Sequence, residues 1–185
     1  MIEIEMPDSK ALEDARQTFA ALSHGRALLD DASVFAGEAP AISAPRLHAH
    51  ATAPLPPSDG ELEAALLRNL SLRRAYRGFV AAGAVYRLGE VIAASTDQIP
   101  PRRGVGCRIS VEASKAEADQ FIVILELDGG AAGTAPAVLV LCDGDDHCHR
   151  FPLPSPHRGV IQFIVRADDA ILPLLRDPGT EALLR

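Results

Sequence analysis

The hydrophobic pattern changes its period near residue 105, and this change constrains the fold more than any other feature of the chain. Between residues 58 and 94 the large apolar residues recur every three to four positions, which is typical of a helix. After residue 105 they occupy alternate positions, as Cys107, Ile109 and Val111 do, which is typical of a strand with one wet face. The sequence therefore predicts helices followed by a sheet.

Five segments in the second half have strand patterns, at residues 107–113, 121–127, 137–142, 147–153 and 160–165, and residues 180–184 are a candidate sixth strand. Turn-forming residues separate them, for example Asp143 to Asp146. Connections this short cannot hold the crossovers that parallel strands need. We predict an α+β fold with an N-terminal helical arm and a long helix, followed by an antiparallel β-meander or half-sandwich of five to six strands.

The first half is predicted to be helical on both sides of a linker. Ser9 can cap a helix over residues 9–29, and the Ser58 to Glu61 capping box predicts a long helix over 58–94. Prolines make residues 32–57 an expected extended linker. The predicted organisation is a helical arm (1–31), an Ala/Pro-rich linker (32–57) and an α+β domain (58–185) whose sheet covers 104–185.

Charge and apolar composition exclude several partner classes. The net charge of −7 disfavours binding to nucleic acid or to an anionic membrane surface, because both need a basic face. No apolar stretch reaches the roughly twenty residues that cross a bilayer. The first residues lack a signal-peptide pattern, and three cysteines without an export signal suit reduced thiols. We predict a cytoplasmic protein that binds neither nucleic acid nor membrane.

One dense group of metal-ligand residue types stands at a predicted hairpin tip. Cys142, His147, Cys148 and His149 are candidate ligands for zinc, which prefers thiolate and imidazole. With a two-residue turn at 144–145, the two cysteines point to opposite sides of the sheet. With a three-residue loop at 144–146 they lie directly opposite each other, and a shared metal or a disulfide becomes possible. The register of this hairpin therefore decides what the site can do.

A second candidate site is a group of arginines in the predicted long helix. Residues 61–103 hold seven Lys or Arg against four Asp or Glu, between acidic flanks. The arginines could bind a phosphate or an acidic partner, and the competing interpretation is a solvated face paired with those flanks. The candidate interaction residues are Arg68, Arg73, Arg74 and Arg77.

No common catalytic template is present, since the chain lacks G-x-S-x-G, G-x-x-x-x-G-K and H-E-x-x-H. We therefore predict a non-catalytic interaction or scaffold module without a cofactor, which binds a protein partner or itself through apolar sheet surface or the long helix. The alternative is a metal- or thiol-dependent protein that uses the hairpin from Cys142 to His149. An enzyme with a dispersed active site is a third hypothesis, which only a structure can address.

Overall fold

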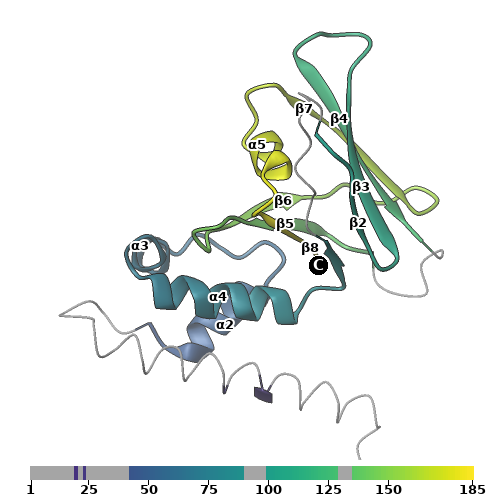
Figure 1. Cartoon of the computed structure of the whole chain (residues 1–185). Coiled ribbons are helices and arrows are strands. Elements are labelled where there is room, and N and C mark those ends of the chain that lie inside the picture. Colours follow the sequence, from purple (N-terminus) through teal and green to yellow (C-terminus); the bar gives the residue numbers. More distant parts are fainter. Residues whose placement is uncertain (1–18, 21–22, 24–41, 90–98, 129–134) are drawn as a thin grey trace, which may run out of the picture. The chain divides into compact units, whose positions relative to one another are not determined.

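The computed structural model describes residues 19–20, 23, 42–89, 99–128 and 135–185. The chain divides into two compact units, residues 1–82 and 83–185, and Figure 1 shows helices in the first and a curled sheet in the second. This confirms the predicted mixed α+β class with an antiparallel sheet. The number of strands and the layout of the helices differ from the prediction.

The described part of the first unit contains three helices, α2 (Ala44–Thr52), α3 (Gly60–Arg68) and α4 (Leu70–Ala82). α2 and α4 are packed through aromatic rings, with His48 edge-on to Phe79 at 5.1 Å and His50 Nδ1 lying 3.0 Å from the Tyr76 hydroxyl oxygen. The buried side of α4 follows helical spacing: Leu72, Ala75, Tyr76, Phe79 and Val80.

The prediction of one long helix over 58–94 is wrong, because Asn69 interrupts it. The Asn69 N–H donates to the Ala65 carbonyl at the end of α3, and its side-chain oxygen accepts from the Leu72 N–H at the start of α4. Asparagine competes well for such bonds, so one residue ends one helix and begins the next. After α4 the chain turns into a strand at Tyr86.

The start of α3 also differs from the predicted capping box by one position. Asp59, not Ser58, is the N-cap, and its side chain accepts from the Leu62 N–H at 3.1 Å. Glu63 reaches back to the Asp59 N–H at 3.2 Å. Asp59 also pairs with Arg46 of α2 at 2.7 Å, which ties the beginnings of two helices together.

The predicted extended linker over 32–57 contains helix α2, so the extended prediction is wrong for residues 44–52. Ser43 caps this helix, and Pro45 stands in its first turn. The N–H groups of the first turn make no bond within the helix, so proline, which lacks an N–H, loses no helical bond there. Pro45, one of the prolines that suggested a linker, therefore permits a helix start. The predicted helix over 9–29 lies outside the described residues except at positions 19, 20 and 23.

The second unit is an eight-stranded sheet in which every neighbouring pair is antiparallel, in the order β6-β5-β8-β1-β2-β3-β4-β7. Its strands are β1 (Tyr86–Leu88), β2 (Arg102–Gly104), β3 (Cys107–Ala113), β4 (Gln120–Leu127), β5 (Val138–Cys142), β6 (Cys148–Pro152), β7 (Val160–Arg166) and β8 (Glu181–Leu184).

All five predicted strands are present, and the candidate sixth is β8. The count of five to six is nevertheless too low, because β1 and β2 were not expected. Both are three residues long, too short to establish an alternating pattern. β1 lies within the predicted long helix, and β2 lies in the Pro/Arg segment before residue 104.

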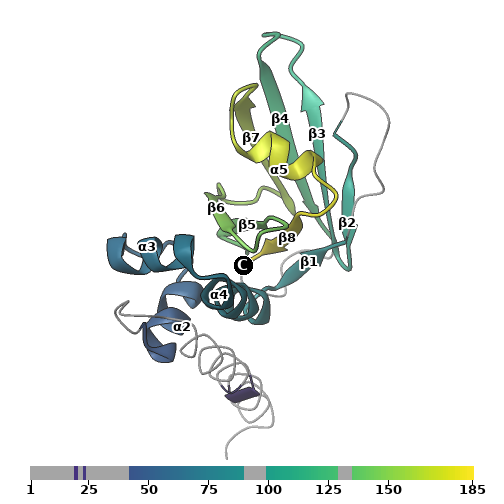
Figure 2. The ribbon, with the colours of Figure 1, turned by 60° about the vertical axis from the view of Figure 1, so that its left-hand side comes forward.

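Helix α5 (Ile171–Arg176) covers one face of the curled sheet (Figure 2). Ile171, Leu172 and Leu175 of this helix are buried in one cluster with sheet residues. Pro173 stands in the first turn of α5, where proline is tolerated. The buried sheet side chains of this cluster are Leu88, Cys107, Ile109, Val123, Leu125, Leu139, Leu141, Ile161, Val165, Ala182 and Leu184.

A charged side chain, Arg102, is buried beside this core at 1 % exposure. Its guanidinium donates to the backbone carbonyls of Leu174, Leu175, Asp177 and Thr180. These carbonyls belong to the end of α5 and the turn before β8, where the helix dipole is negative. Burial lowers the pKa of Arg102, and the charge of Asp177 opposes this shift. Arg102 therefore fixes the α5–β8 connection to β2.

None of the helices among the described residues combines the length and the apolar character that crossing a bilayer requires.

Candidate functional site

The hairpin between β5 and β6 has the three-residue loop, Gly144 to Asp146. The Asp143 N–H donates to the His147 carbonyl at 2.9 Å, and the Asp146 N–H donates to the Asp143 carbonyl at 3.1 Å. Asp146 adopts a left-handed conformation with φ of 65°, as the last residue of such a loop does. Of the two registers open from the sequence, the structure has the one that places Cys142 opposite Cys148.

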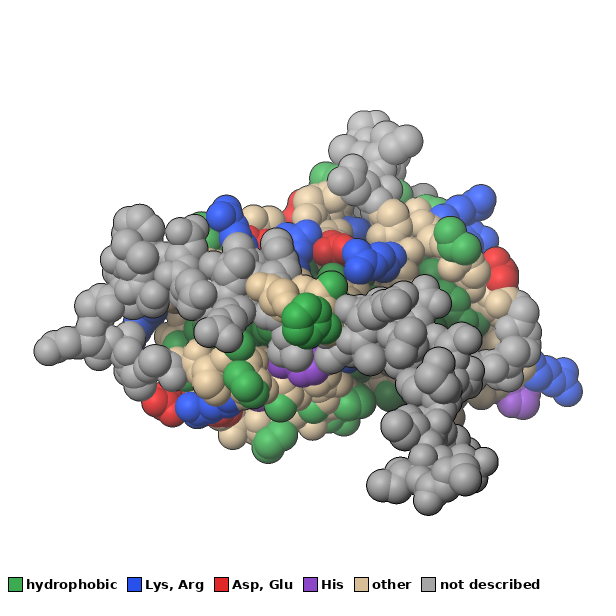
Figure 3. Space-filling model, turned by 90° about the horizontal axis from the view of Figure 1, so that it is seen from below, with side chains coloured by type: hydrophobic (Ala, Val, Ile, Leu, Met, Phe, Trp, Pro, Cys, Tyr) green, Lys and Arg blue, Asp and Glu red, His purple; other side chains and the backbone are tan. Residues whose placement is uncertain are grey.

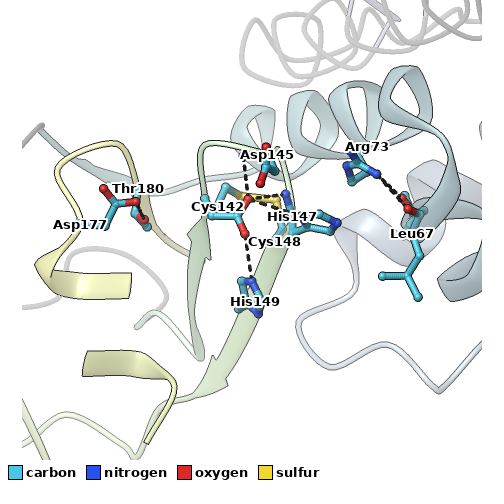
Figure 4. Close-up of polar contacts among 11 residues, drawn as sticks. Leu67, Arg73, Cys142, Asp145, His147, Cys148, His149, Asp177 and Thr180 are labelled. Atoms are coloured by element: carbon cyan, nitrogen blue, oxygen red, sulfur yellow. Dashed lines mark hydrogen bonds and ion pairs between the residues drawn. A yellow bond between two sulfur atoms is a disulfide. The ribbon is translucent and has the colours of Figure 1, made fainter. Parts of the chain in front are cut away.

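Cys142 and Cys148 form a disulfide across this hairpin (Figure 4). Asp143 and His147 form a hydrogen-bonded pair, so the next pair, Cys142 and Cys148, is a non-hydrogen-bonded pair. Non-hydrogen-bonded pairs are the closely spaced ones in an antiparallel ladder. The Cα atoms of Cys142 and Cys148 are 4.1 Å apart. The expectation of reduced thiols is therefore wrong for these two residues. It is confirmed for Cys107, which is free and buried, and whose thiol has a pKa raised by burial.

The two histidines of the predicted zinc set lie around Asp143. His147 Nδ1 is 3.6 Å from one carboxylate oxygen of Asp143, and His149 Nε2 is 3.5 Å from the other. The same carboxylate accepts from the backbone N–H groups of Asp145 and His147 at 3.0 and 2.9 Å. Burial raises the pKa of Asp143, but the bonds from His147, His149 and Asp145 outweigh it, and the net pKa is lowered.

The register separates the four predicted zinc ligands into two pairs. Side chains alternate between faces along a strand, so Cys142 and Cys148 share one face while His149 and its partner Leu141 share the other. Within the described ranges, no three His, Cys, Asp or Glu side chains are grouped so as to hold a metal ion. The structure thus brings the thiols together in a disulfide and the imidazoles together at a carboxylate, and zinc binding by this set stays a prediction.

Oxidation of this hairpin is expected to stabilise the protein. A cross-link lowers the entropy of the unfolded chain, and for a loop this short the gain is about 2 kcal/mol. Reduced protein should therefore unfold in urea with a free energy about 2 kcal/mol smaller than oxidised protein, followed by circular dichroism. Equal stability of the two forms, or three titratable thiols in unreduced unfolded protein, would contradict the disulfide.

The Asp143 carboxylate should give the hairpin a pH-dependent contribution to stability. Its pKa is lower when folded than the ordinary 3.8, so the contribution is present above about pH 4 and is lost as the pH falls through the lower folded value. We expect Asp143→Asn to cost about 1 kcal/mol at pH 7. The difference in free energy of unfolding between the variant and the wild type should shrink as the pH falls below about 4, measured by urea unfolding. A difference in stability that does not change with pH would contradict this role of the Asp143 carboxylate.

The predicted arginine group is divided between two helices. Arg68 is in the last turn of α3, while Arg73, Arg74 and Arg77 are in α4. Arg73 donates to the carbonyls of Leu66 and Leu67 at the end of α3, at 3.0 and 3.2 Å. It therefore supports the α3–α4 junction. On the face that Figure 3 shows, basic side chains are mixed with acidic and apolar ones outside the grey atoms.

Among the described strands, β6 and β7 form the two edges of the sheet, and the sequence did not identify them. In β7, the residues bonded to β4 are the odd-numbered ones: Leu127 donates to Gly159 and Ala167 donates to Asp119 at the two ends of the ladder. The N–H and C=O groups of Gln162 and Ile164 therefore point away from β4. No described strand lies on that side of β7.

Edge β6 carries features that discourage strand addition. The Leu153 N–H donates to Ala137, so Pro152 and Arg150, one and three residues away, direct their backbones outward from β5. Proline has no N–H to offer, and a charged residue at an edge hinders pairing. β7, with the sequence Val-Ile-Gln-Phe-Ile-Val-Arg, has no proline and only one charge, at its end.

The outer face next to edge β7, opposite the core cluster, carries three isoleucines beside the polar Gln162 and Arg166 of β7. Ile122 and Ile164 are direct partners on β4 and β7, and Ile124 follows two residues along β4. Ile164 is 64 % exposed although it lies in the middle of a strand. This isoleucine face, defined as Ile122, Ile124 and Ile164, continues without a break to the free backbone edge.

Comparison with known proteins adds no assignment: no model of a protein family, no curated protein and no solved structure matches this chain.

Proposed function

We propose that this chain is a non-catalytic interaction module that binds an extended β-strand at the free edge of β7. The observation that carries the proposal is the contrast between the two edges of the sheet. β6 is protected by Arg150 and Pro152, whereas β7 offers unpaired backbone groups beside an apolar face. In strand addition the backbone bonds supply affinity, and the alternate side chains supply specificity.

The isoleucine face supports the same proposal from the side chains. A strand added to β7 with an apolar residue at alternate positions would extend the row Ile122–Ile164 by one more side chain. It would also remove part of the exposed surface of Ile164 from water, at about 25 cal/mol per Å². Both contributions act at one edge, so a single strand can use them together.

The test uses a short fluorescein-labelled peptide with isoleucine at alternate positions and threonine between them. Gln162→Pro removes an outward N–H without removing a bond to β4, since Gln162 is an outward-facing position. Gln162→Ala is the matched control, because it keeps the N–H. Fluorescence anisotropy should show binding to the wild type and to Gln162→Ala, with a loss of about tenfold or more in Gln162→Pro. Equal binding to all three, or absence of binding at a protein concentration where the chain is monomeric, would refute strand addition.

A thiol-dependent function is the second candidate, because Cys142 and Cys148 lie directly opposite each other. It predicts that the reduced hairpin binds zinc through the Cys142 and Cys148 thiolates, which share one face, while His147 and His149 lie on the other face. Calorimetric titration of zinc into reduced protein should then show stoichiometric binding that Cys148→Ser abolishes. If reduced wild type and Cys148→Ser give the same heats, this candidate fails.

A further inference from the structure

The free edge of β7 has two definite ends. At its start, Val160 exchanges both backbone bonds with His157, at 2.8 and 3.0 Å, so the position beside Val160 is already occupied. At its end, the Arg166 carbonyl accepts from the Asp169 N–H at 3.0 Å as the chain turns away. A second strand therefore has room only beside residues 162–166, and the midpoint of this segment is Ile164.

An edge of this kind can pair with itself. Two-fold rotation about the midpoint places an identical antiparallel strand alongside, with Ile164 opposite Ile164 of the second copy. Ile164 is an outward-facing position, so each Ile164 N–H meets the other Ile164 carbonyl. Each Arg166 N–H likewise meets the Gln162 carbonyl of the other copy, and each Gln162 N–H meets the Arg166 carbonyl, whose oxygen also accepts from Asp169. The outward donors and acceptors in the middle of the edge are then satisfied.

The side chains match on both faces in this register. On the outer face the row Ile122–Ile164 meets the same row of the second copy, which makes one continuous line of isoleucines across the junction. On the inner face Phe163, which is only partly buried, comes opposite Val165 of the second copy. Apolar side chains therefore face apolar side chains on each side of the joined sheet.

The charges are complementary as well. Arg166 comes opposite the neutral Gln162, so no like charges face each other along the strand. The exposed Asp168 of one copy, 3.8 Å from its own Arg166, comes to the end of β7 that carries the exposed Arg158 of the other, and symmetry repeats this arrangement. A single-residue shift of the register would place isoleucine on the wrong face.

From these matches we infer that the strand which binds β7 is β7 of a second copy of this chain, in the register Ile164 to Ile164. The inference rests on the proposed function and identifies its partner. It makes the working form a two-fold dimer with one sheet running through both copies, and it leaves edge β6 at the two outer ends.

The first experiment measures the oligomeric state of the full chain by sedimentation equilibrium over a concentration series. Wild type and Ile164→Val should form a dimer. Ile164→Lys places two like charges directly opposite each other and should raise the dissociation constant about tenfold or more. Gln162→Pro should do the same while Gln162→Ala does not. A monomeric wild type, or a dimer that all four variants leave unchanged, would overturn the inference.

The second experiment tests the register by cysteine cross-linking under mild oxidation. In a hydrogen-bonded antiparallel pair the Cα atoms are about 5.5 Å apart, within the range that a disulfide spans. Ile164→Cys should therefore form a covalent dimer. Gln162→Cys should not, because the two copies of residue 162 are offset by about four positions along the strands. Cross-linking of Gln162→Cys but not of Ile164→Cys would refute the register.

The outcomes separate this inference from the proposed function. If the labelled peptide binds at the β7 edge but the chain is a monomer, strand addition stands and the second copy is not the partner. If the peptide fails to bind and the chain is a monomer, both are refuted. If Ile164→Lys still forms the dimer, and Gln162→Pro loses peptide binding, the inference alone is refuted.

Discussion

Arg102→Met should destabilise the second unit by about 3 to 5 kcal/mol. The substitution leaves the buried carbonyls of Leu175 and Thr180, and the partly buried carbonyls of two neighbouring residues, without the donor they now have. Each such loss costs about 1 to 3 kcal/mol, and the flexible methionine fills the volume without supplying a donor. The free energy of unfolding in urea, measured by circular dichroism because the chain has no tryptophan, would report the loss.

Arg102→Lys is the informative companion to this substitution. Lysine keeps the charge, but its ammonium is a single point with three donors. It cannot reach all the carbonyls that the planar guanidinium of arginine bonds. We expect a loss intermediate between Arg102→Met and the wild type. A lysine variant as stable as the wild type would mean that charge, rather than the array of bonds, holds α5 in place. A methionine variant as stable as the wild type would refute the structural role altogether.

Gly104→Ala should cost about 3 kcal/mol or more. A Cβ at residue 104 would overlap the Arg87 carbonyl, and backbone on a paired strand has no flexible end that can move aside. The variant can relieve this overlap only by separating β1 from β2, whose pairing the structure places at Leu88 and Gly104. Thermal and urea unfolding should both show the loss.

Gly144→Ala is the matched control for this substitution. Gly144 lies in the β5–β6 loop, where a Cβ meets nothing within 4 Å, and its φ is not positive. The stability should therefore stay within about 0.5 kcal/mol of the wild type. If Gly104→Ala proved equally harmless, the close approach of β2 to Arg87 would be wrong.

The strands that the sequence predicts are those whose evidence is local. Residues 121–127 and 160–165 are apolar, β-branched runs bounded by turn residues, and these features lie within a few positions of each other. Strand β1 has no such local evidence. Its three residues are extended because Tyr86 and Leu88 pair with Leu184 and Ala182, almost a hundred positions away. Pairing partners at that distance leave no periodic trace in the sequence.

The candidate site was predictable in residue type but not in geometry. The cysteines, histidines and aspartates of the hairpin are evident in the sequence, whereas their faces depend on loop length. A non-glycine residue, Asp146, takes the left-handed position that fixes the three-residue loop. Aspartate does not require a left-handed conformation, so the sequence allowed both the two-residue and the three-residue loop. Edge β7 was not predictable either, because it pairs with β4 and not with its chain neighbour β6.

Strand β8 lies between β5 and β1, and this position has a consequence for how the protein folds. The hairpins β2–β3–β4 and β5–β6 can each form from residues close in sequence. The two groups become one sheet only when Leu183 pairs with Val140 on one side and Arg87 on the other. The chain must close long loops, at a cost in entropy, before these strand pairs can form hydrogen bonds. The junction should therefore form late and limit the folding rate. Until then the cell would hold two partial sheets, each with an additional uncovered edge.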